Sequence, residues 1–235
     1  MNKLIQKTTY IIIILAHLVL ISSCDAILFF KNYKDKSEVF HFETNGIQYE
    51  LNKIKNSAGV SVIANSQNSY NGTINIPETV IFNNHSYPVT VIGEQAFENC
   101  RLLDTVKISK NIKIIGANAF ANSTIKDINL DGVQIIGEKA FSNCNNITNL
   151  NISNIQIIGD EAFLQCDSLT NVNISNIQII GKKTFKECKK LKKATLKNIQ
   201  IIGKEAFGNC YSLDTIIEDN IQISHKTAYK NCPKR

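Results

Sequence analysis

The stretch IQIIGKEAFGNC, residues 199–210, decides how the chain is interpreted, because it is repeated. Two near-copies are IQIIGDEAFLQC (155–166) and IQIIGKKTFKEC (177–188). Four more align with them: VTVIGEQAFENC (89–100), IKIIGANAFANS (112–123), VQIIGEKAFSNC (133–144) and IQISHKTAYKNC (221–232). Successive copies begin 21–23 residues apart. A period in the low twenties is typical of a solenoid whose repeats are single small structural units.

The sequence between the copies also recurs, as NITNLNISN (146–154), SLTNVNISN (168–176) and KLKKATLKN (190–198). Its alternating apolar positions predict a short strand with one buried face, and stacking would pair these strands in parallel. The Ile-x-Ile-Ile stretch predicts a second extended segment. Ala-Phe then packs inward on a short turn or helix, which gives one ring per coil: Phe97, Phe120, Phe141, Phe163, Phe185, Phe207 and Tyr229. We expect about seven coils.

One turn position holds either Asn or Gly in each coil, which indicates a positive φ angle. The residues are Asn111, Gly132, Asn154, Asn176, Asn198 and Asn220.

These motifs resemble the BspA-type leucine-rich repeat, I-x-x-I-G-x-x-A-F-x-x-C-x-x-L-x-x-L-x-L, found in surface proteins of bacteria and mucosal protozoan parasites. The resemblance covers roughly residues 89–232. It implies a leucine-rich repeat solenoid with a β-strand plus a short helix or turn per coil, and a role in adhesion to host matrix or other cells. The proline that often follows the family's strand is replaced here by Ser109, Ser153, Ser175 or Lys197, so the turns could differ from those of the family.

Upstream of the repeats, FHFETNGIQYEL (40–51) alternates around Asn45-Gly46 and predicts a hairpin. A second strand pair is expected around Asn83-Asn84. Because solenoid ends expose a core face and need a cap, we interpret residues 40–88 as a β-rich N-terminal cap and residues 89–235 as the solenoid.

Residues 1–23 have the layout of a secretory signal peptide, with lysines before an apolar run that ends in small residues. Ile21-Ser22-Ser23-Cys24 resembles the lipobox of bacterial lipoproteins, which implies that Cys24 is lipidated and that residues 24–39 form a lipidated tether. Ordinary cleavage, for example after Ala26, and an uncleaved signal anchor remain alternatives. The sequence therefore predicts an exported protein on the cell surface or outer membrane, held by an N-terminal lipid anchor, with secretion as the alternative.

The net charge of +6 is concentrated in one place, because residues 182–197 carry eight lysines against Glu187. A local cluster on a nearly neutral chain does not predict nucleic-acid binding. The lysines either attract polyanions such as sulfated glycans or form a soluble rim. They are Lys182, Lys183, Lys186, Lys189, Lys190, Lys192, Lys193 and Lys197.

The outward positions of the predicted strands form a second candidate surface, since solenoids present extended concave faces to ligands. The alternative is an Asn ladder that bonds along the stack and binds no ligand. The residues are Lys107, Asn129, Asn149, Asn151, Asn171, Asn173 and Thr195.

Six cysteines occupy one repeat position, where Ser123 also occurs, which favours packing over disulfides; ligand pairs with metal-site spacing are absent. They are Cys100, Cys144, Cys166, Cys188, Cys210 and Cys232. No nucleophile, acid–base or phosphate-loop motif is present, so the sequence predicts neither a catalytic site nor a cofactor. The two functions that remain are recognition of an extracellular protein or glycan and a structural role in the cell envelope.

Overall fold

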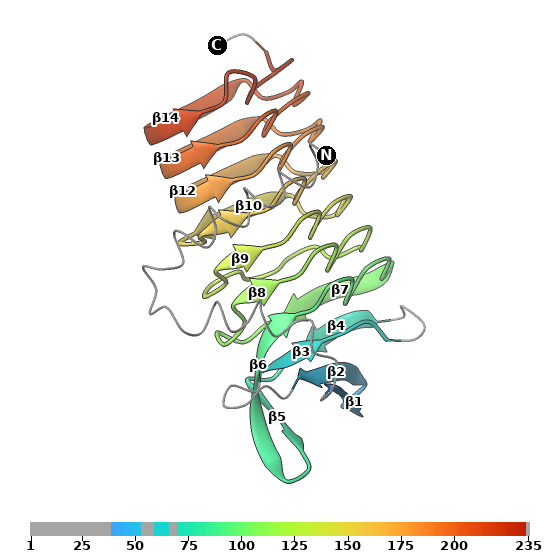
Figure 1. Cartoon of the computed structure of the whole chain (residues 1–235). Helices are drawn as coiled ribbons and strands as arrows, with labels where there is room; N and C mark the ends of the chain where they lie inside the picture. The colour runs from blue at the N-terminus through green and yellow to red at the C-terminus, as the bar shows by residue number, and fades with distance from the viewer. Residues whose placement is uncertain (1–38, 53–58, 66–69, 234–235) are drawn as a thin grey trace, which may run out of the picture.

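The computed structural model describes residues 39–52, 59–65 and 70–233. The described chain winds into a column of stacked coils with a strand-rich N-terminal end (Figure 1). Turns of the column follow one another at the sequence period, so each coil contacts mainly its two neighbours. The solenoid makes about six turns. The seventh sequence copy forms the last coil, which pairs with the preceding coil. The predicted leucine-rich repeat solenoid is confirmed.

Fourteen strands are assigned within the described residues, and most belong to one sheet ordered β1-β2-β3-β6-β8-β9-β11-β12-β13-β14. The N-terminal strands are β1 Val39–Thr44, β2 Ile47–Asn52, β3 Val60–Val62, β4 Asn71–Asn75, β5 Thr79–Phe82 and β6 His85–Ile92. The solenoid strands are β7 Leu102–Lys107, β8 Ile114–Ile115, β9 Ile135–Ile136, β10 Asn149–Ser153, β11 Ile157–Ile158, β12 Asn171–Ile180, β13 Lys193–Ile202 and β14 Thr215–Ser224. Neighbouring coils pair in parallel, as the repeat predicts.

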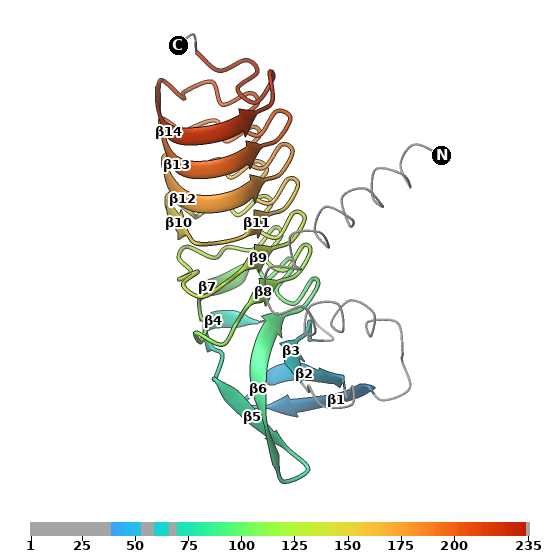
Figure 2. The same ribbon diagram turned by 60° about the vertical axis from the view of Figure 1, so that its left-hand side comes forward.

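Both predicted hairpins form at the N-terminal end. Strands β1 and β2 pair antiparallel across Asn45 and Gly46, and β5 and β6 pair antiparallel across Asn83 and Asn84. All four turn residues have positive φ angles, which matches the twist of a two-residue hairpin turn. The β5–β6 hairpin projects from the end of the column opposite the last coil (Figure 2).

Coil-like pairing begins upstream of residue 89. Strand β3 pairs in parallel with β6, and β4 pairs in parallel with β7. The ring of Tyr70 lies 4.9 Å from that of Phe97, so it occupies the end of the phenylalanine stack. Residues 60–65 and 70–75 therefore pair as a coil does and cover the first repeat.

The predicted ring stack runs through the whole core. From Phe97 to Tyr229, successive ring centroids are 5.0–5.3 Å apart and the ring planes lie within 14° of parallel. The six phenylalanines are fully buried, whereas Tyr229 on the last coil is half-buried. A single coil could not bury its own ring, so neighbouring coils stabilise one another.

The Ala-Phe segment is a series of tight turns, and no helix is assigned in the described part of the chain. Ala162 donates within its own coil to Gly159, while Phe163 donates across to the carbonyl of Thr184 on the next coil at 2.8 Å. Two residues per turn take positive φ angles, which cannot continue a right-handed helix. They are Gln95 and Asn99, Asn118 and Asn122, Lys139 and Asn143, Glu161 and Gln165, Lys183 and Glu187, and Glu205 and Asn209.

The glycine that recurs in the first six copies is required by close packing between coils. Gly93, Gly116, Gly137, Gly159, Gly181 and Gly203 lack a positive φ angle. A Cβ atom on Gly181 would lie 2.7 Å from the backbone carbon of Gly159 in the preceding coil. His225 takes this position in the last coil, where the glycine pattern ends.

The Asn/Gly corner has the predicted positive φ angle at five of its six positions. Asn111 is the exception, because the turn Ser109–Asn111 is one residue longer than its counterparts such as Ser153-Asn154. The following coil is one residue short between Ser123 and Ile125. In that coil the outer strand is reduced to a single bridge, between Thr105 and Asp127.

Candidate recognition surface

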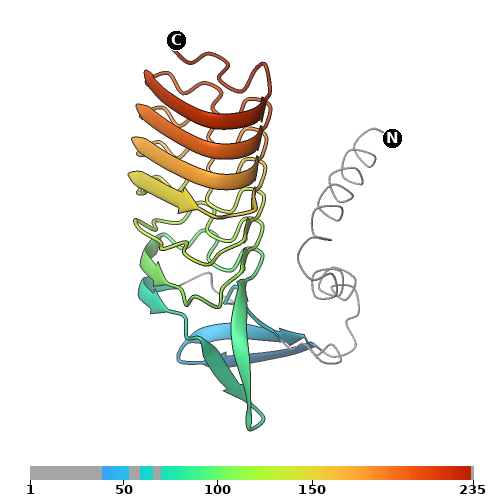
Figure 3. The ribbon, with the colours of Figure 1, turned by 90° about the vertical axis from the view of Figure 1, so that its left-hand side faces the viewer.

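Four adjacent strands, β10, β12, β13 and β14, present one continuous outer face (Figures 2 and 3). Along each strand, apolar residues such as Val172 and Ile174 are buried while alternate residues point outward, as period-two geometry requires. The outward residues, in register, are Asn149, Asn171, Lys193 and Thr215; Asn151, Asn173, Thr195 and Ile217; and Ser153, Ser175, Lys197 and Asp219. We call these twelve residues the outer sheet face.

On β10 and β12, the asparagines of the outer sheet face bond to one another. Asn171 donates from Nδ2 to Oδ1 of Asn149 at 2.9 Å, and Asn173 donates likewise to Asn151 at 2.8 Å. Asn149 and Asn171 also donate from Nδ2 to the hydroxyls of Thr148 and Thr170, so this row keeps acceptor capacity at Oδ1 of Asn171. The asparagine rows thus stabilise the stack and also expose an ordered polar surface.

On β13, the outer sheet face becomes basic. Lys193 and Lys197 are exposed on either side of Thr195, each two residues from it along the strand. They belong to the predicted lysine cluster, whose members lie around one coil. The structure places these two members on the same face as the asparagines. Counting outward positions in steps of two along 193–197 would have found this from the sequence.

Lys107 and Asn129 are separated from the other predicted sheet residues. Lys107 is exposed at the end of β7, which pairs with β4. Asn129 lies outside the assigned strands, and its Oδ1 accepts from the backbone N–H of Asp131 at 2.9 Å. The short second coil interrupts the row, so the continuous surface starts at β10.

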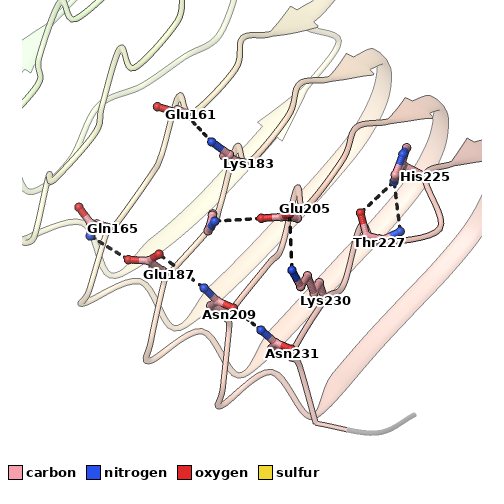
Figure 4. A network of polar contacts seen from close by, with 11 residues as sticks. Glu161, Gln165, Lys183, Glu187, Glu205, Asn209, His225, Thr227, Lys230 and Asn231 are labelled. Carbon is pink, nitrogen blue, oxygen red and sulfur yellow. Dashed lines mark hydrogen bonds and ion pairs between the residues drawn. The ribbon is translucent and has the colours of Figure 1, made fainter.

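Several other lysines of the cluster lie in the turns and form ion pairs (Figure 4). Lys183 is 3.2 Å from Glu161, Lys186 is 2.9 Å from Glu205, and Lys189 is 3.4 Å from Asp167. Each ion pair joins two adjacent coils. The carboxylate offsets the positive charge of the lysine, which is the charge that would attract a polyanion. Lys190 and Lys192 are exposed, and the backbone N–H of Lys182 donates to Asp160.

The Lys186–Glu205 pair changes the titration of both groups. The hydrogen bond from Lys186 lowers the pKa of Glu205, and the same bond raises the pKa of Lys186. Both shifts favour the charged forms at neutral pH.

The cysteine position is a buried ladder. All six cysteines that the structure describes are free thiols, and five of them donate from Sγ to the phenylalanine carbonyl of the preceding coil at 3.0–3.2 Å. Burial raises the pKa of Cys144 to about 12, so its thiol stays protonated and unreactive at neutral pH. This geometry fits the packing interpretation. Cys24, the predicted lipidation site, lies outside the described residues.

Among the described residues, no group of three or more His, Cys, Asp or Glu side chains is arranged to hold a metal ion. The same part of the chain contains no helix long and apolar enough to cross a membrane.

The stacked coils and their sequence match a known family. Residues 63–192 and 130–234 match the BspA type leucine-rich repeat region in six copies. The chain belongs to this family. The match begins at residue 63, close to where coil-like pairing begins in the structure.

Solved structures of bacterial leucine-rich repeat proteins share the fold of this BspA-type protein. A leucine-rich repeat protein from T. pallidum, TpLRR, is 19% identical with a TM-score of 0.56, and the match covers 74% of this chain and 91% of that one. One from Bacteroides capillosus is 25% identical with a TM-score of 0.50, covering 58% of this chain and 99% of that one. No curated protein matches the sequence.

Proposed function

We propose that this protein is a cell-surface recognition protein that binds an extracellular protein or glycan through the outer sheet face, in adhesion to host matrix or other cells. The observation that carries the proposal is the separation of repeated and varying residues. The repeated Phe and Cys positions, and the first and last aliphatic residues of each Ile-x-Ile-Ile stretch, are buried in the coils up to residue 210. Positions that differ from coil to coil lie in the exposed turns and on the outer sheet face, where Asn171, Lys193 and Thr215 follow one another in register and a partner would contact them.

The composition of the outer sheet face suits a polar ligand. The asparagine amides offer both donors and acceptors in fixed rows, while Lys193 and Lys197 add positive charge beside them. Ile217, which is 42% exposed, adds an apolar contact on the last strand. Amides, lysines and one apolar side chain in register form a surface for an extended hydroxyl- or acid-bearing polymer.

A binding assay tests this proposal. The full chain would be measured against a panel of matrix proteins and a sulfated glycan such as heparin. We expect saturable binding to at least one member, and we expect changing Asn151, Asn173 and Thr195 to Ala together to weaken it by about tenfold, since about 1.4 kcal/mol of lost contacts changes the affinity tenfold. Binding that survives these substitutions would exclude the outer sheet face.

We further propose that the protein is exported and anchored through a lipid on Cys24. Several acyl chains together hold a protein stably at a membrane, whereas one holds it only marginally. Metabolic labelling with a fatty acid, compared between the native chain and Cys24→Ser, provides the test. An unlabelled native chain would exclude lipidation and leave ordinary cleavage or a signal anchor.

The asparagine rows favour a second candidate, a structural component of the cell envelope without a specific ligand. Amides that bond along the stack contribute to scaffold stability whether or not a ligand exists. If no member of the panel binds, the structural role is the better account.

A further inference from the structure

A second surface feature lies apart from the outer sheet face, where the second coil is one residue short. The other described coils have two residues between the Cys-position residue and the next buried aliphatic residue, as in Cys144-Asn145-Asn146-Ile147, but this coil has only Thr124 between Ser123 and Ile125. A hollow of about 400 Å³ opens at this level. Arg101 lines it from the first coil, Asn122, Ser123 and Thr124 from the second, and Asn143, Asn145 and Asn146 from the third.

The charge in this hollow comes from an arginine in a chain that otherwise uses lysine. The 26 basic residues include only Arg101 and Arg235 as arginines. Arg101 is exposed and forms no ion pair with any described residue, and no acidic side chain lines the hollow. The two acidic residues nearest to Arg101 along the chain are Glu98, which does not line the hollow, and Asp104, which is paired with Lys126 at 2.8 Å. A guanidinium in this setting is free to form two parallel hydrogen bonds to a carboxylate.

The amides around Arg101 are held in place by the neighbouring coils. Asn143 donates to Oδ1 of Asn122 at 3.0 Å, Asn146 donates to the carbonyl of Thr124 at 2.9 Å, and Oδ1 of Asn145 accepts from the backbone of Asp167 at 2.9 Å. Each bond fixes one end of an amide and leaves further donor or acceptor capacity at the other. Preoriented amides suit hydroxyl groups, because each amide can bond to a hydroxyl as donor or acceptor.

We propose that this hollow binds a carboxylate-bearing sugar unit, with Arg101 pairing with the carboxylate and the surrounding asparagines bonding to the ring hydroxyls. A volume of about 400 Å³ lies at the small end of ligand pockets, which matches one or two sugar rings better than a folded partner. The polar lining favours a hydroxyl-rich ligand over an apolar peptide segment. The site shares no residue with the outer sheet face, so it is tested independently of the proposed function.

Arginine NMR tests the proposal directly, because the chain has only two arginine side chains to observe. The full chain labelled with ¹⁵N-arginine would be titrated with glucuronate, with glucose and acetate as controls for the hydroxyls and the carboxylate alone. We expect the Nε–H signal of Arg101 to shift saturably with glucuronate, while Arg235 serves as an internal reference. No shift of Arg101, or an equal shift with acetate at equal concentration, would overturn the proposal.

Variants then separate the contribution of the bidentate Arg101 geometry from that of its positive charge. Glucuronate affinity, measured by saturation transfer to the sugar, should fall about tenfold in Arg101→Lys, because a lysine keeps the charge but loses the bidentate geometry. Asn145→Ala should weaken binding severalfold, while Lys190→Gln, which removes an exposed charge outside the hollow, should leave it unchanged. Unfolding midpoints equal to that of the native chain would show that the variants fold. Unchanged affinity in both Arg101→Lys and Asn145→Ala would contradict the site.

Discussion

The rings of Phe141 and Phe163 lie 5.0 Å apart between centroids and within 2° of parallel. Isolated aromatic pairs prefer offset or edge-to-face arrangements over face-to-face stacking. The spacing here is close to the 4.7–4.9 Å between paired β-strands. The stack therefore takes its period from the backbone, and each ring fills the core of one coil.

Truncating a ring should cost more in the middle of the stack than at its end. We expect Phe163→Ala to lower the free energy of unfolding by about 4 kcal/mol, the usual cost of deleting a buried phenylalanine. Tyr229→Ala should cost roughly half as much, because Tyr229 is only half-buried. Urea unfolding measures both values. Equal losses of unfolding free energy at the two positions would contradict the claim that neighbouring coils on both sides stabilise a ring in the middle of the stack.

Adding one methyl group between coils should also be destabilising. In Gly181→Ala the new Cβ would lie 2.7 Å from backbone atoms of the preceding coil, so the stack would have to open. We expect a loss of about 3 kcal/mol, as for an overpacked core. Gly59→Ala is the matched control, since its nearest contact at 2.7 Å is the side-chain Oγ1 of Thr90, which can move. Thermal unfolding of the two variants should differ clearly; similar midpoints would refute the close-packing role.

The cysteine ladder should tolerate serine. Cys188 donates to the carbonyl of Phe163 at 3.2 Å, and a serine hydroxyl at the same place can also donate. We expect Cys188→Ser to change the free energy of unfolding by less than about 1 kcal/mol. Mass measurement after alkylation of the unfolded native chain should show all six repeat thiols modified without prior reduction. A mass shift that appears only after reduction would reveal disulfides and contradict the ladder.

The Lys186–Glu205 pair predicts a pH dependence of stability. Its hydrogen bond lowers the pKa of Glu205 from the ordinary value of 4.5, so the folded state favours the carboxylate. The stability that this pair contributes is present above the unfolded-state pKa and is lost as pH falls through the lower folded-state pKa. The difference in unfolding free energy between the native chain and Glu205→Gln should therefore be present at neutral pH and shrink on acidification. Glu94→Gln, which changes an exposed glutamate, is the control. A difference in unfolding free energy that grows on acidification would contradict a stabilising Lys186–Glu205 pair.

Much of the fold could be predicted from the sequence because every coil repeats the same pattern of buried and turn residues. The period fixed the parallel pairing, and the alternation at Val172 and Ile174 identified the buried face. Asn45-Gly46 and Asn83-Asn84 identified the hairpins through their tolerance of positive φ. The sequence left a short turn and a short helix open for the Ala-Phe segment, and the turn forms because residues such as Lys183 and Glu205 adopt positive φ against their intrinsic preference. Hydrogen bonds to the next coil impose this conformation, and a single repeat cannot reveal them.

The candidate surface was predicted in part. Asn151, Asn173 and Thr195 do lie on one face, but Asn129 does not join it, since one missing residue breaks the strand of the second coil. The lysines lie around one coil, and their proximity in the sequence does not show in which direction each side chain points. The structure separates Lys193 and Lys197 on the strand from Lys183 and Lys186 in the turns.

The central claim is that recognition uses the outer sheet face and does not follow from basic charge alone. The most direct test compares two double variants with equal net charge, Lys193→Gln/Lys197→Gln on that face and Lys190→Gln/Lys204→Gln in the turns, for binding to heparin by the full chain. We predict that only the first pair weakens binding, by about tenfold. Equal weakening by both pairs, or no effect of the first, would contradict the account.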